Sequence, residues 1–324
     1  MIIITGGCGF IGSNLVKALE ELDFEEICVV DRFSDIKQKN LSKRKKIKKI
    51  IPEELEKFLI KNRKKISLFI HLGAKSSTTE SNSRIVLDNN INLSMFIWNW
   101  CSENNKRLIY ASSAATYGDG KNGFKDLQTK NYLSNLEPLN LYGWSKHITD
   151  KVFLNQKDKR PVQWVGLKFF NVFGPHEYHK GNMQSVIYKI YKKIMNNEKV
   201  ELFKSHKREY EDGEQVRDFI YIKDVVHIII WFIENKKING IFNVGSGKSR
   251  SFNALANAVF KFSNKEKKVS YVNTPTFLRE KYQYYTQADM KKIYKAGYQN
   301  KFFSLEEGIE DYITKILMQK DLYI

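Results

Sequence analysis

Short apolar runs alternate with longer amphipathic stretches through the first 170 residues of the chain. Runs of four to eight mostly apolar residues bounded by turn residues are typical of buried strands, and apolar positions recurring every three or four residues are typical of helices. This pattern predicts strands at Ile2–Thr5, Ile27–Asp31, Leu68–His71, Leu108–Ala111 and Val162–Phe169. The helices predicted between them are Phe10–Glu20, Glu53–Asn62, Arg84–Asn104 and Leu141–Gln156.

Regular alternation of strand and helix predicts an α/β fold, with βαβ units forming a doubly wound, Rossmann-like parallel sheet covered on both faces. After Phe170 the pattern loosens. Helices are predicted there at Met183–Asn196, Lys223–Glu234, Phe252–Phe262 and Leu305–Met318, and short strands at Val200–Phe203, Phe219–Ile222 and Ile241–Val244. No Gly/Ser linker divides the chain. We therefore expect a Rossmann domain over residues 1–170 and a smaller, closely packed α/β domain over 171–324, with the chain crossing this approximate boundary again.

Composition narrows the class of protein. The chain has 324 residues, of which 42% are hydrophobic and 28% are charged, so it can build a core. Its longest apolar run, Val225–Ile233, is interrupted by His227 and falls short of the roughly 18–20 residues that a transmembrane helix needs. Met1 leads directly into a predicted strand without the features of a signal peptide. The three cysteines lack zinc or CxxC spacing, which favours reduced thiols, no metal site and a cytoplasmic protein.

The formal net charge of +18 raises nucleic acid, a membrane surface or a polyanionic substrate as candidate partners. Of the 54 basic residues 44 are lysine, and the segment Arg32–Lys65 holds 14 basic and 4 acidic residues. We call Arg32–Lys65 the basic segment. No nucleic-acid recognition motif accompanies it, so we expect neither a nucleic-acid nor a membrane partner, and most of Lys37–Lys49 is interpreted as a solvated basic loop.

A glycine-rich turn follows the first predicted strand. Glycines stand at Gly6, Gly9 and Gly12, between that strand and the first helix. Glycine permits a tight turn and close approach of the backbone to a pyrophosphate, while the helix N-terminus presents free N–H groups and a positive dipole end. The motif predicts a dinucleotide-binding site.

The end of the second strand bears on which dinucleotide binds. Asp31 lies 19 residues after Gly12, where a carboxylate can accept hydrogen bonds from an adenosine ribose, and alone it favours NAD. Arg32 follows at once, and a guanidinium can pair with a 2′-phosphate in bidentate fashion. The local charge therefore favours NADP.

Tyr142 and Lys146 form a YxxxK pair that can carry acid–base chemistry. Two other pairs start at Tyr117 and Tyr188, so context has to decide. Tyr142 begins a predicted helix after the fourth strand, whose end carries Ser113, and four-residue spacing puts tyrosine and lysine on one helix face. An ammonium beside a phenol is expected to lower the phenol's pKa from its usual value of about 10, which makes Tyr142 a candidate base. Ser113 is a candidate hydrogen-bond partner of the substrate oxygen, or else it only lines the strand end.

Five segments together resemble the extended short-chain dehydrogenase/reductase superfamily: Thr5–Asn14, Ala111–Gly118, Tyr142–Lys146, Phe170–Pro175 and Arg217–Asp224. More narrowly, the chain is similar to the ADP-L-glycero-D-manno-heptose 6-epimerase family. That similarity rests on Gly73–Glu80, Leu87–Asn90, His179–Met183, Tyr282–Gln283 and Thr286–Asp289, and it runs essentially end to end. Individually these segments also have simpler interpretations; Ser77–Glu80, for example, fits a helix capping box.

The resemblance implies NADP as cofactor and inversion of C6 of ADP-D-glycero-D-manno-heptose through a transient 6-keto sugar. Tyr142 and Lys180 would be the two proton-transfer groups, with Lys146 assisting Tyr142 and holding the nicotinamide ribose. Beyond the glycines and Asp31, the implied NADP contacts are Phe10, Ile11, Arg32, Lys39, Leu72, Gly73, Ala74, Lys75, Ser76, Asn89, Lys146, Val172 and Lys180. The implied substrate contacts are Ser113, Asn171, Asn182, Lys189, Phe203, Arg217 and Tyr282. The family also implies a homo-oligomer.

The chain departs from the family pattern in three places. Tyr178 replaces a usual glycine, Asn182 replaces a usual serine, and the charged stretch His206–Gln215 is longer. Which lysine of Lys37–Lys49 meets a 2′-phosphate stays open. The nearest rival function is another nucleotide-sugar epimerase, such as a UDP-hexose 4-epimerase. A 4,6-dehydratase is disfavoured because Ala114 and Ala115 stand where that reaction wants an acidic pair. A non-catalytic dinucleotide sensor would not need both Tyr142 and Lys146.

Overall fold

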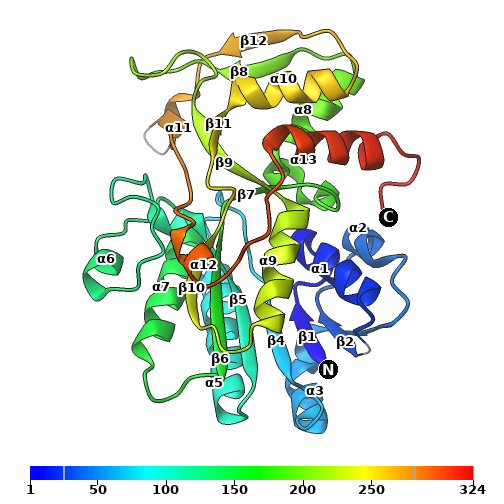
Figure 1. The fold of residues 1–324 in the computed structure, drawn as a ribbon, viewed down its shortest axis with the longest axis vertical. Coiled ribbons are helices and arrows are strands. Elements are labelled where there is room, and N and C mark those ends of the chain that lie inside the picture. Colours follow the sequence, from blue (N-terminus) through cyan, green and yellow to red (C-terminus); the bar gives the residue numbers. More distant parts are fainter. Residues whose placement is uncertain (25, 280–281, 324) are drawn as a thin grey trace.

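The computed structural model describes residues 1–24, 26–279 and 282–323. Its larger sheet has seven parallel strands in the order β10-β6-β5-β4-β1-β2-β3 (Figure 1). In chain order these are β1 Ile2–Thr5, β2 Ile27–Val30, β3 Ile47–Ile50, β4 Leu68–His71, β5 Arg107–Ser113, β6 Gln163–Phe169 and β10 Gly240–Val244. The predicted Rossmann-like α/β fold is confirmed.

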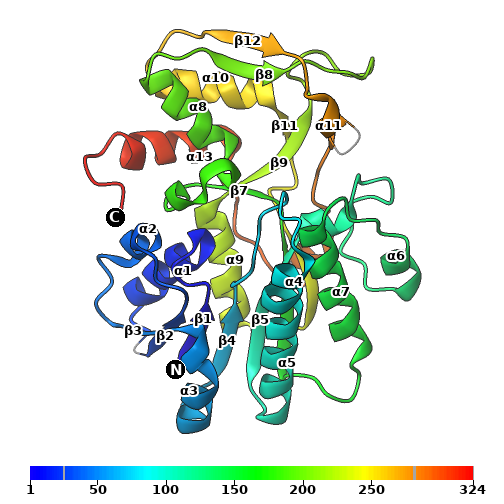
Figure 2. The same ribbon diagram turned by 180° about the vertical axis from the view of Figure 1, so that it is seen from behind.

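Helices cover both faces of this sheet (Figures 1 and 2). Along each strand alternate residues face opposite sides, so the sheet has two cores. Ile4 and Val29 lie in the core shared with α1 Phe10–Glu21 and α9 Ile222–Glu234. Ile3 and Phe69 lie in the other core, beneath α3 Leu55–Asn62, α5 Leu93–Glu103 and α7 Leu141–Asn155.

The second part of the chain builds a smaller α/β unit beyond the carboxyl ends of the sheet strands (Figure 1). It contains a three-stranded sheet of β7 Asn171–Phe173, β9 Val216–Tyr221 and β11 Ser249–Ser251, and a pair of β8 Val200–Phe203 with β12 Val269–Val272. Its longer helices are α8 Val186–Met195, α10 Phe252–Phe262 and α13 Leu305–Tyr312. The remaining short helices of the molecule are α2 Asp35–Gln38, α4 Ser83–Val86, α6 Lys130–Ser134, α11 Thr276–Arg279 and α12 Lys291–Lys295.

The chain crosses between the two parts more than once. After β9 it returns through α9, which packs on α1, to β10, which pairs in parallel with β6. A later stretch then runs between the two parts: the Val216 N–H donates to Tyr284 O at 2.9 Å, and the Asp289 N–H donates to Phe124 O at 3.1 Å. The two parts are therefore joined by several chain crossings and by hydrogen bonds.

The local structure differs in detail from what the sequence predicts. The basic loop contains α2 and, from Ile47 to Ile50, the edge strand β3, whose central lysines are exposed while Ile50 is buried. Lysines on an exposed edge discourage pairing with another sheet, so a pattern that looked like solvated loop is also an edge-strand pattern. The helix predicted over Arg84–Asn104 is confirmed as an unbroken helical stretch from Ser83 to Glu103, but it contains an unforeseen π-helical turn at Leu87–Asn92. The N-cap of α4 is Asn82, and Ser77–Glu80 is not a capping box.

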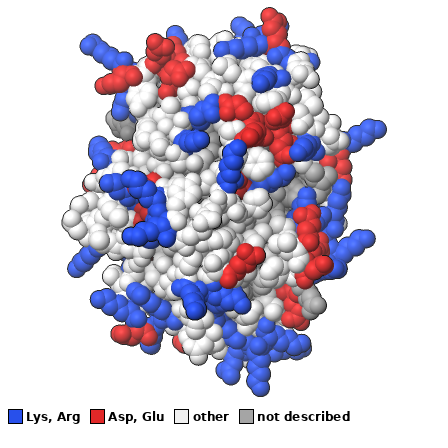
Figure 3. Space-filling view, viewed as in Figure 1, with Lys and Arg blue, Asp and Glu red and all other residues white. Residues whose placement is uncertain are grey.

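No helix within the described residues is long and apolar enough to cross a membrane. Lys and Arg side chains are prominent at the end of the molecule where α3 lies (Figure 3). Part of the basic segment is paired: Glu20 accepts from the backbone N–H groups of Lys45 and Lys46 and contacts Arg44 at 3.3 Å. The excess charge is thus partly neutralised where the segment folds back on α1.

Candidate active site

The glycine-rich turn lies where the strand order reverses. β1 pairs with β2 on one side and with β4 on the other, and ligands of open parallel sheets bind beyond the carboxyl ends of strands at such a switch point. Gly6 has φ +71°, and a Cβ there would lie 2.7 Å from Gly73 N. A Cβ on Gly12 would overlap the carbonyl oxygen of Gly6. Only glycine therefore fits this turn.

Helix α1 starts directly after the turn. Its N-cap is Gly9, which has no side chain to cap the helix, and the first intrahelical bond runs from Ser13 N to Gly9 O at 3.0 Å. The first N–H groups of an α-helix, here those of Phe10, Ile11 and Gly12, have no intrahelical acceptor. With the glycine cradle, this helix start fits a dinucleotide pyrophosphate.

Asp31 is tied to the glycine-rich turn. Its carboxylate accepts from Cys8 N at 2.9 Å and from Arg32 N at 2.7 Å, and the Lys37 ammonium lies 3.5 Å away. The guanidinium of Arg32 pairs with Glu53 at 2.8 Å on the surface, and Lys39 is exposed. The ammonium beside Asp31 is therefore that of Lys37, a lysine that the sequence left undecided. Lys39, which the resemblance implied as an NADP contact, is exposed.

Asn40 is a site residue that the sequence did not single out. It is buried, and its amide donates to Cys8 O at 2.9 Å and to His176 O at 3.1 Å. The same nitrogen lies 3.2 Å from Nδ1 of His179. Asn40 therefore fastens the glycine-rich turn to the loop that carries Lys180. It was missed because it stands among lysines of the basic segment.

The loop after β4 carries Leu72 to Ser76 and forms the far wall of the switch point. Leu72 N donates to Thr5 O at 3.1 Å, and Lys75 N donates to Asn90 Oδ1 at 2.7 Å. The predicted contact Asn89 is exposed, and its amide donates back to Ile85 O at 2.8 Å. The neighbouring Asn90 is buried instead and also donates to Ser145 of α7 at 2.9 Å. The π-helical turn, which sequence reasoning did not foresee, contains both asparagines.

His71 links this wall to the strand beside it. Thr5 Oγ1 lies 2.6 Å from His71 Nδ1, and His71 Nε2 lies 2.9 Å from Ser94 Oγ. Ser94 in turn donates to Asn90 O at 2.5 Å. One consistent direction makes Thr5 the donor to Nδ1 and gives His71 a proton on Nε2. Burial, with help from the Lys146 charge, lowers the pKa of His71 to about 3, so the ring is neutral.

Helix α7 brings Tyr142 and Lys146 to the end of β5. Asn140 caps it by accepting from Gly143 N at 2.9 Å, and a Cβ on Gly143 would lie 2.7 Å from Ala115 O, so helix and strand end are close. Lys146 is 2% exposed, and Ser113 is buried. Tyr142 and Ser113 are hydrogen-bonded partners. The predicted grouping of these three residues at one strand end is what the structure contains.

The surroundings of Tyr142 raise the pKa of its phenol, whereas the neighbouring Lys146 was expected to lower it. Burial raises the pKa of Tyr142 above its usual range, the Ser113 hydrogen bond lowers it, and Asp150 raises it further. Lys146 is itself affected by burial, which lowers the pKa of its ammonium to about 8, while Asp150 acts in the opposite direction. Desolvation outweighs the neighbouring charge because Lys146 is almost fully buried and Tyr142 is partly buried at the strand end.

Lys180 approaches the site from the second part of the chain. It lies in a helical turn over Tyr178–Met183, and its ammonium is 5.3 Å from the centre of the Phe10 ring at the start of α1. Burial lowers the pKa of Lys180, Glu177 raises it and Lys189 lowers it. Lys189 donates to Asn182 O at 2.6 Å. The predicted residues Lys180 and Asn182 thus lie in a helical turn that reaches the start of α1, and Lys189 of α8 contacts that turn.

A second cluster lies farther out in the smaller unit. The Arg217 guanidinium is 5.2 Å from the Tyr282 ring, and the Phe203 and Tyr282 rings are 6.0 Å apart. Asn171 and Val172 lie in β7, next to the strand that carries Arg217. The charged stretch His206–Gln215 packs here: His206 N donates to the Tyr284 hydroxyl at 2.8 Å. The predicted substrate contacts therefore form one group near the second acid–base loop and one around Arg217.

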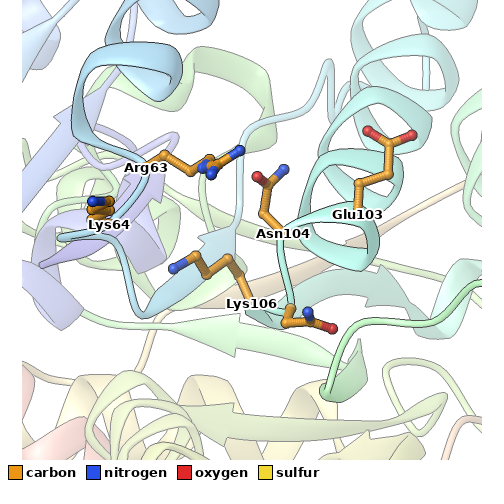
Figure 4. Close-up of a pocket in the computed structure, with 6 residues that line it drawn as sticks. Arg63, Lys64, Glu103, Asn104 and Lys106 are labelled. Atoms are coloured by element: carbon orange, nitrogen blue, oxygen red, sulfur yellow. The ribbon is translucent and has the colours of Figure 1, made fainter.

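Two surface hollows among the described residues bear on the site. One, of about 510 Å³, is lined by Asn182, Lys189 and neighbouring side chains, so it belongs to the Lys180 loop. The other, of about 290 Å³, lies between the ends of α3 and α5, where Arg63, Lys64 and Lys106 project (Figure 4). It is at the amino-terminal edge of the sheet strands. Ligands of such sheets bind at the opposite edge, so this hollow is not part of the candidate active site.

These features define a nucleotide-binding α/β protein with acid–base groups at the carboxyl edge of its sheet. Residues 2–245 match the NAD dependent epimerase/dehydratase family, and the chain belongs to that family. Within it, the chain is similar from end to end to ADP-L-glycero-D-manno-heptose-6-epimerases. The protein of that name from Fusobacterium nucleatum is 42% identical, with 100% of both chains covered. The narrower resemblance predicted from the motifs is confirmed.

Solved structures agree with this placement. The ADP-L-glycero-D-manno-heptose-6-epimerase of Helicobacter pylori is 30% identical, with a TM-score of 0.81 over 98% of this chain and 96% of that one. A UDP-N-acetylglucosamine 4-epimerase from Methanobrevibacter ruminantium M1, in complex with UDP-N-acetylmuramic acid, is 27% identical, with a TM-score of 0.82 over 96% of both chains. The same fold therefore occurs in epimerases that act on different nucleotide sugars.

Proposed function

We propose that the protein epimerises ADP-D-glycero-D-manno-heptose at C6 to the L-glycero form. The observation that carries this proposal is the pairing of two acid–base groups at one edge of the sheet. Tyr142 stands at the carboxyl end of β5 beside Ser113, and Lys180 lies against Phe10, just beyond the carboxyl end of β1. Full-length similarity to enzymes named for this reaction supports the substrate.

Inversion of an alcohol carbon needs proton transfer on two faces of the sugar. Tyr142 takes or gives the proton of the C6 hydroxyl on one face, and Lys180 serves the other face after the 6-keto sugar has turned. The lowered pKa of Lys180 suits a group that must both give and accept a proton. Ser113 holds the reacting oxygen, and Lys146 holds the nicotinamide ribose. When bound, the nicotinamide would accept the hydride from C6 and return it to the other face of the carbonyl, so that no external oxidant or reductant is consumed.

We propose NADP as the cofactor, in preference to NAD. Asp31 is engaged by two backbone N–H groups, and Lys37 lies 3.5 Å from it, so a cation already stands beside the ribose position. A 2′-phosphate can also draw Arg32 from its surface pair with Glu53, because an exposed pair is held weakly. Mass spectrometry of the dinucleotide released from purified protein tests this. Release of NAD alone would contradict the assignment.

The reaction itself is tested by incubating the holoenzyme with ADP-D-glycero-D-manno-heptose and following the C6 epimer by NMR. We expect conversion to a mixture of both epimers without added oxidant. The main alternative is a UDP-hexose 4-epimerase, which the similarity to the Methanobrevibacter enzyme supports. UDP-glucose is therefore assayed in parallel. Turnover of UDP-glucose with no product from the heptose would replace our proposal by that alternative.

We also propose a cytoplasmic homo-oligomer with no nucleic-acid or membrane partner. Cys8, Cys28 and Cys101 are all free and buried, which suits a reducing compartment. The homo-oligomer rests on family resemblance alone. Analytical ultracentrifugation of the holoenzyme tests it, and a monomer at micromolar concentration would contradict it.

A further inference from the structure

A fully buried ion pair lies directly behind the catalytic end of β5. Lys168 of β6 and Asp150 of α7 are 1% and 0% exposed, and their charged atoms are 2.8 Å apart. Asp150 also accepts from Ser112 Oγ at 2.7 Å and from the Tyr110 hydroxyl at 3.0 Å. Both oxygens of the carboxylate are therefore used, and the pair joins β5, β6 and α7.

Lys168 is connected to Ser113 through the side chain of Thr116. Lys168 donates to Thr116 Oγ1 at 2.6 Å, and Thr116 donates to Ser113 O at 2.8 Å. The aspartate end lies on α7, one helical turn after Lys146, where four-residue spacing places side chains on the same face. One hydrogen-bond path therefore joins the pair to the strand end that carries Ser113, and Asp150 itself belongs to the helix that carries Tyr142.

A buried pair of this kind is not explained by stability alone. Desolvation of two charges commonly cancels their attraction, so a well-packed apolar pair of similar size is often as stable. Neither Asp150 nor Lys168 is among the residues proposed to contact the cofactor or the sugar. A positioning role would explain why two charged residues are buried here, which packing alone does not explain.

We propose that the Asp150–Lys168 pair is a positioning device for the active site, holding α7 against the end of β5 and placing a fixed negative charge behind Tyr142 and Lys146. Both residues act through others and touch no substrate. The inference rests on the proposed roles of Tyr142 and Lys146 as catalytic groups.

The protonation behaviour of the catalytic groups agrees with this arrangement. After burial, Asp150 is the charged neighbour that raises the pKa of both Tyr142 and Lys146. It thereby keeps Lys146 in its ammonium form and opposes early ionisation of the Tyr142 phenol. Other titratable groups in or next to this cluster, by their printed contacts and electrostatic interactions, are His71 of β4, Tyr110 of β5, Tyr117, His147 of α7 and Lys292 of α12.

The test compares holoenzyme variants Asp150→Asn, Lys168→Met and the double variant. Tetranitromethane nitrates the phenolate form of tyrosine, so peptide mass spectrometry gives the nitration rate of Tyr142 as a function of pH without any substrate. Exposed Tyr294 serves as the internal standard. Melting temperature is measured on the same samples. Ser112→Ala is the matched control, because it removes one hydrogen bond to Asp150 and leaves the charge.

We expect Lys168→Met to lower the melting temperature and turnover, the latter about 100-fold, because a misplaced catalytic group costs about that much. The double variant should recover the melting temperature while its Tyr142 nitration midpoint moves to lower pH. Ser112→Ala should keep the wild-type midpoint. If the double variant does not fold, Asp150→Asn gives the same comparison with the same expected direction.

An unchanged midpoint in the double variant, or in Asp150→Asn, would overturn the proposal and leave a purely structural pair. An equal shift in Ser112→Ala would do the same, because the shift would then not come from the charge. Nitration needs no sugar nucleotide. Failure of the heptose assay would therefore contradict the proposed function without touching this result.

Discussion

At the scale of single residues, burial governs the chemistry of the site more than charge does. Lys146 is 2% exposed, and burial brings the pKa of its ammonium down to about 8. Burial acts in the opposite sense on the Tyr142 phenol, raising its pKa. A bound dinucleotide brings its own charges and hydroxyl groups to this strand end. Burial thus disfavours the charged form of both groups, although a lysine with a pKa of about 8 still carries its charge at pH 7.

Removing either acid–base group should nearly abolish turnover. Tyr142→Phe and Lys180→Met are each expected to lower kcat for heptose epimerisation by roughly 10²–10⁴-fold, the usual contribution of general acid–base catalysis. The dinucleotide should remain bound, because the glycine-rich turn, Asp31 and Lys146 are unchanged in both variants. Steady-state assay and cofactor mass spectrometry measure both. Tyr294→Phe and Lys199→Met, both at exposed positions, are the matched controls. Wild-type activity in Lys180→Met would remove its role as the second base.

Acid should destabilise the protein through His71. The ring is neutral when folded, with a pKa of about 3, against an ordinary value of 6.5. Between those values the unfolded chain binds a proton that the folded chain does not, so stability falls as pH drops from about 6.5 towards 3. The loss attributable to this residue is roughly 5 kcal/mol at most. Urea unfolding at pH 7 and pH 4.5 measures it.

His71→Gln carries no titrating ring, so its unfolding free energy should depend less on pH over that interval. It should also be less stable than wild type at pH 7, because the Thr5 and Ser94 contacts change. His227→Gln, on an exposed position of α9, is the control and should keep most of the acid dependence. The same pH dependence in His71→Gln as in wild type would contradict the assignment.

At the scale of elements, the first βα unit is the part of the site that depends most strictly on backbone shape. Gly12→Ala should destabilise the protein by about 1–3 kcal/mol, the usual cost of overpacking, and weaken dinucleotide binding more than tenfold, because its Cβ meets the Gly6 carbonyl. Thermal unfolding and cofactor retention measure this. The control is Gly123→Ala, at φ +75°, whose Cβ has its nearest neighbours 3.9 Å away. It should keep its cofactor.

Elements with a strong local pattern were predictable. The glycine-rich turn, the Tyr142–Lys146 helix and six of the seven strands of the main sheet follow from apolar runs and turn residues. The edge strand β3 was not predictable as a strand, because one side of an edge faces water and Lys48 and Lys49 look like loop residues. Short strands such as β7 and β11, of three residues each, are held by their neighbours in the fold.

Contacts between distant parts of the sequence were out of reach. Asn40 bonds to His176 across 136 positions, and nothing local marks it. The choice between Asn89 and Asn90 depends on a π-helical turn, which rotates the register by about one residue and has no simple sequence signal. The family resemblance implied roles for individual residues, but it could not predict which way their side chains point.

At the scale of the whole molecule, the net charge of +18 invites a test for nucleic-acid binding. We expect only weak, non-specific binding of duplex DNA, with Kd no tighter than about 10⁻⁶ M at physiological salt. Several cations of the basic segment are paired with carboxylates, as Arg32 is with Glu53 and Lys43 with Asp321. Filter binding at two salt concentrations measures this. Nanomolar binding with a steep salt dependence would contradict it.

The return of the chain through β10 has a consequence for any attempt to divide the protein. A fragment ending at residue 170 would keep the glycine turn, Tyr142 and Lys146, and it would look like a complete cofactor module. It would lack β10, so the wholly buried strand β6 would become an open edge. It would also lack α9, which covers α1. Open apolar edges invite aggregation, so the two activities of binding cofactor and binding sugar cannot be exchanged between relatives as cassettes cut at that point.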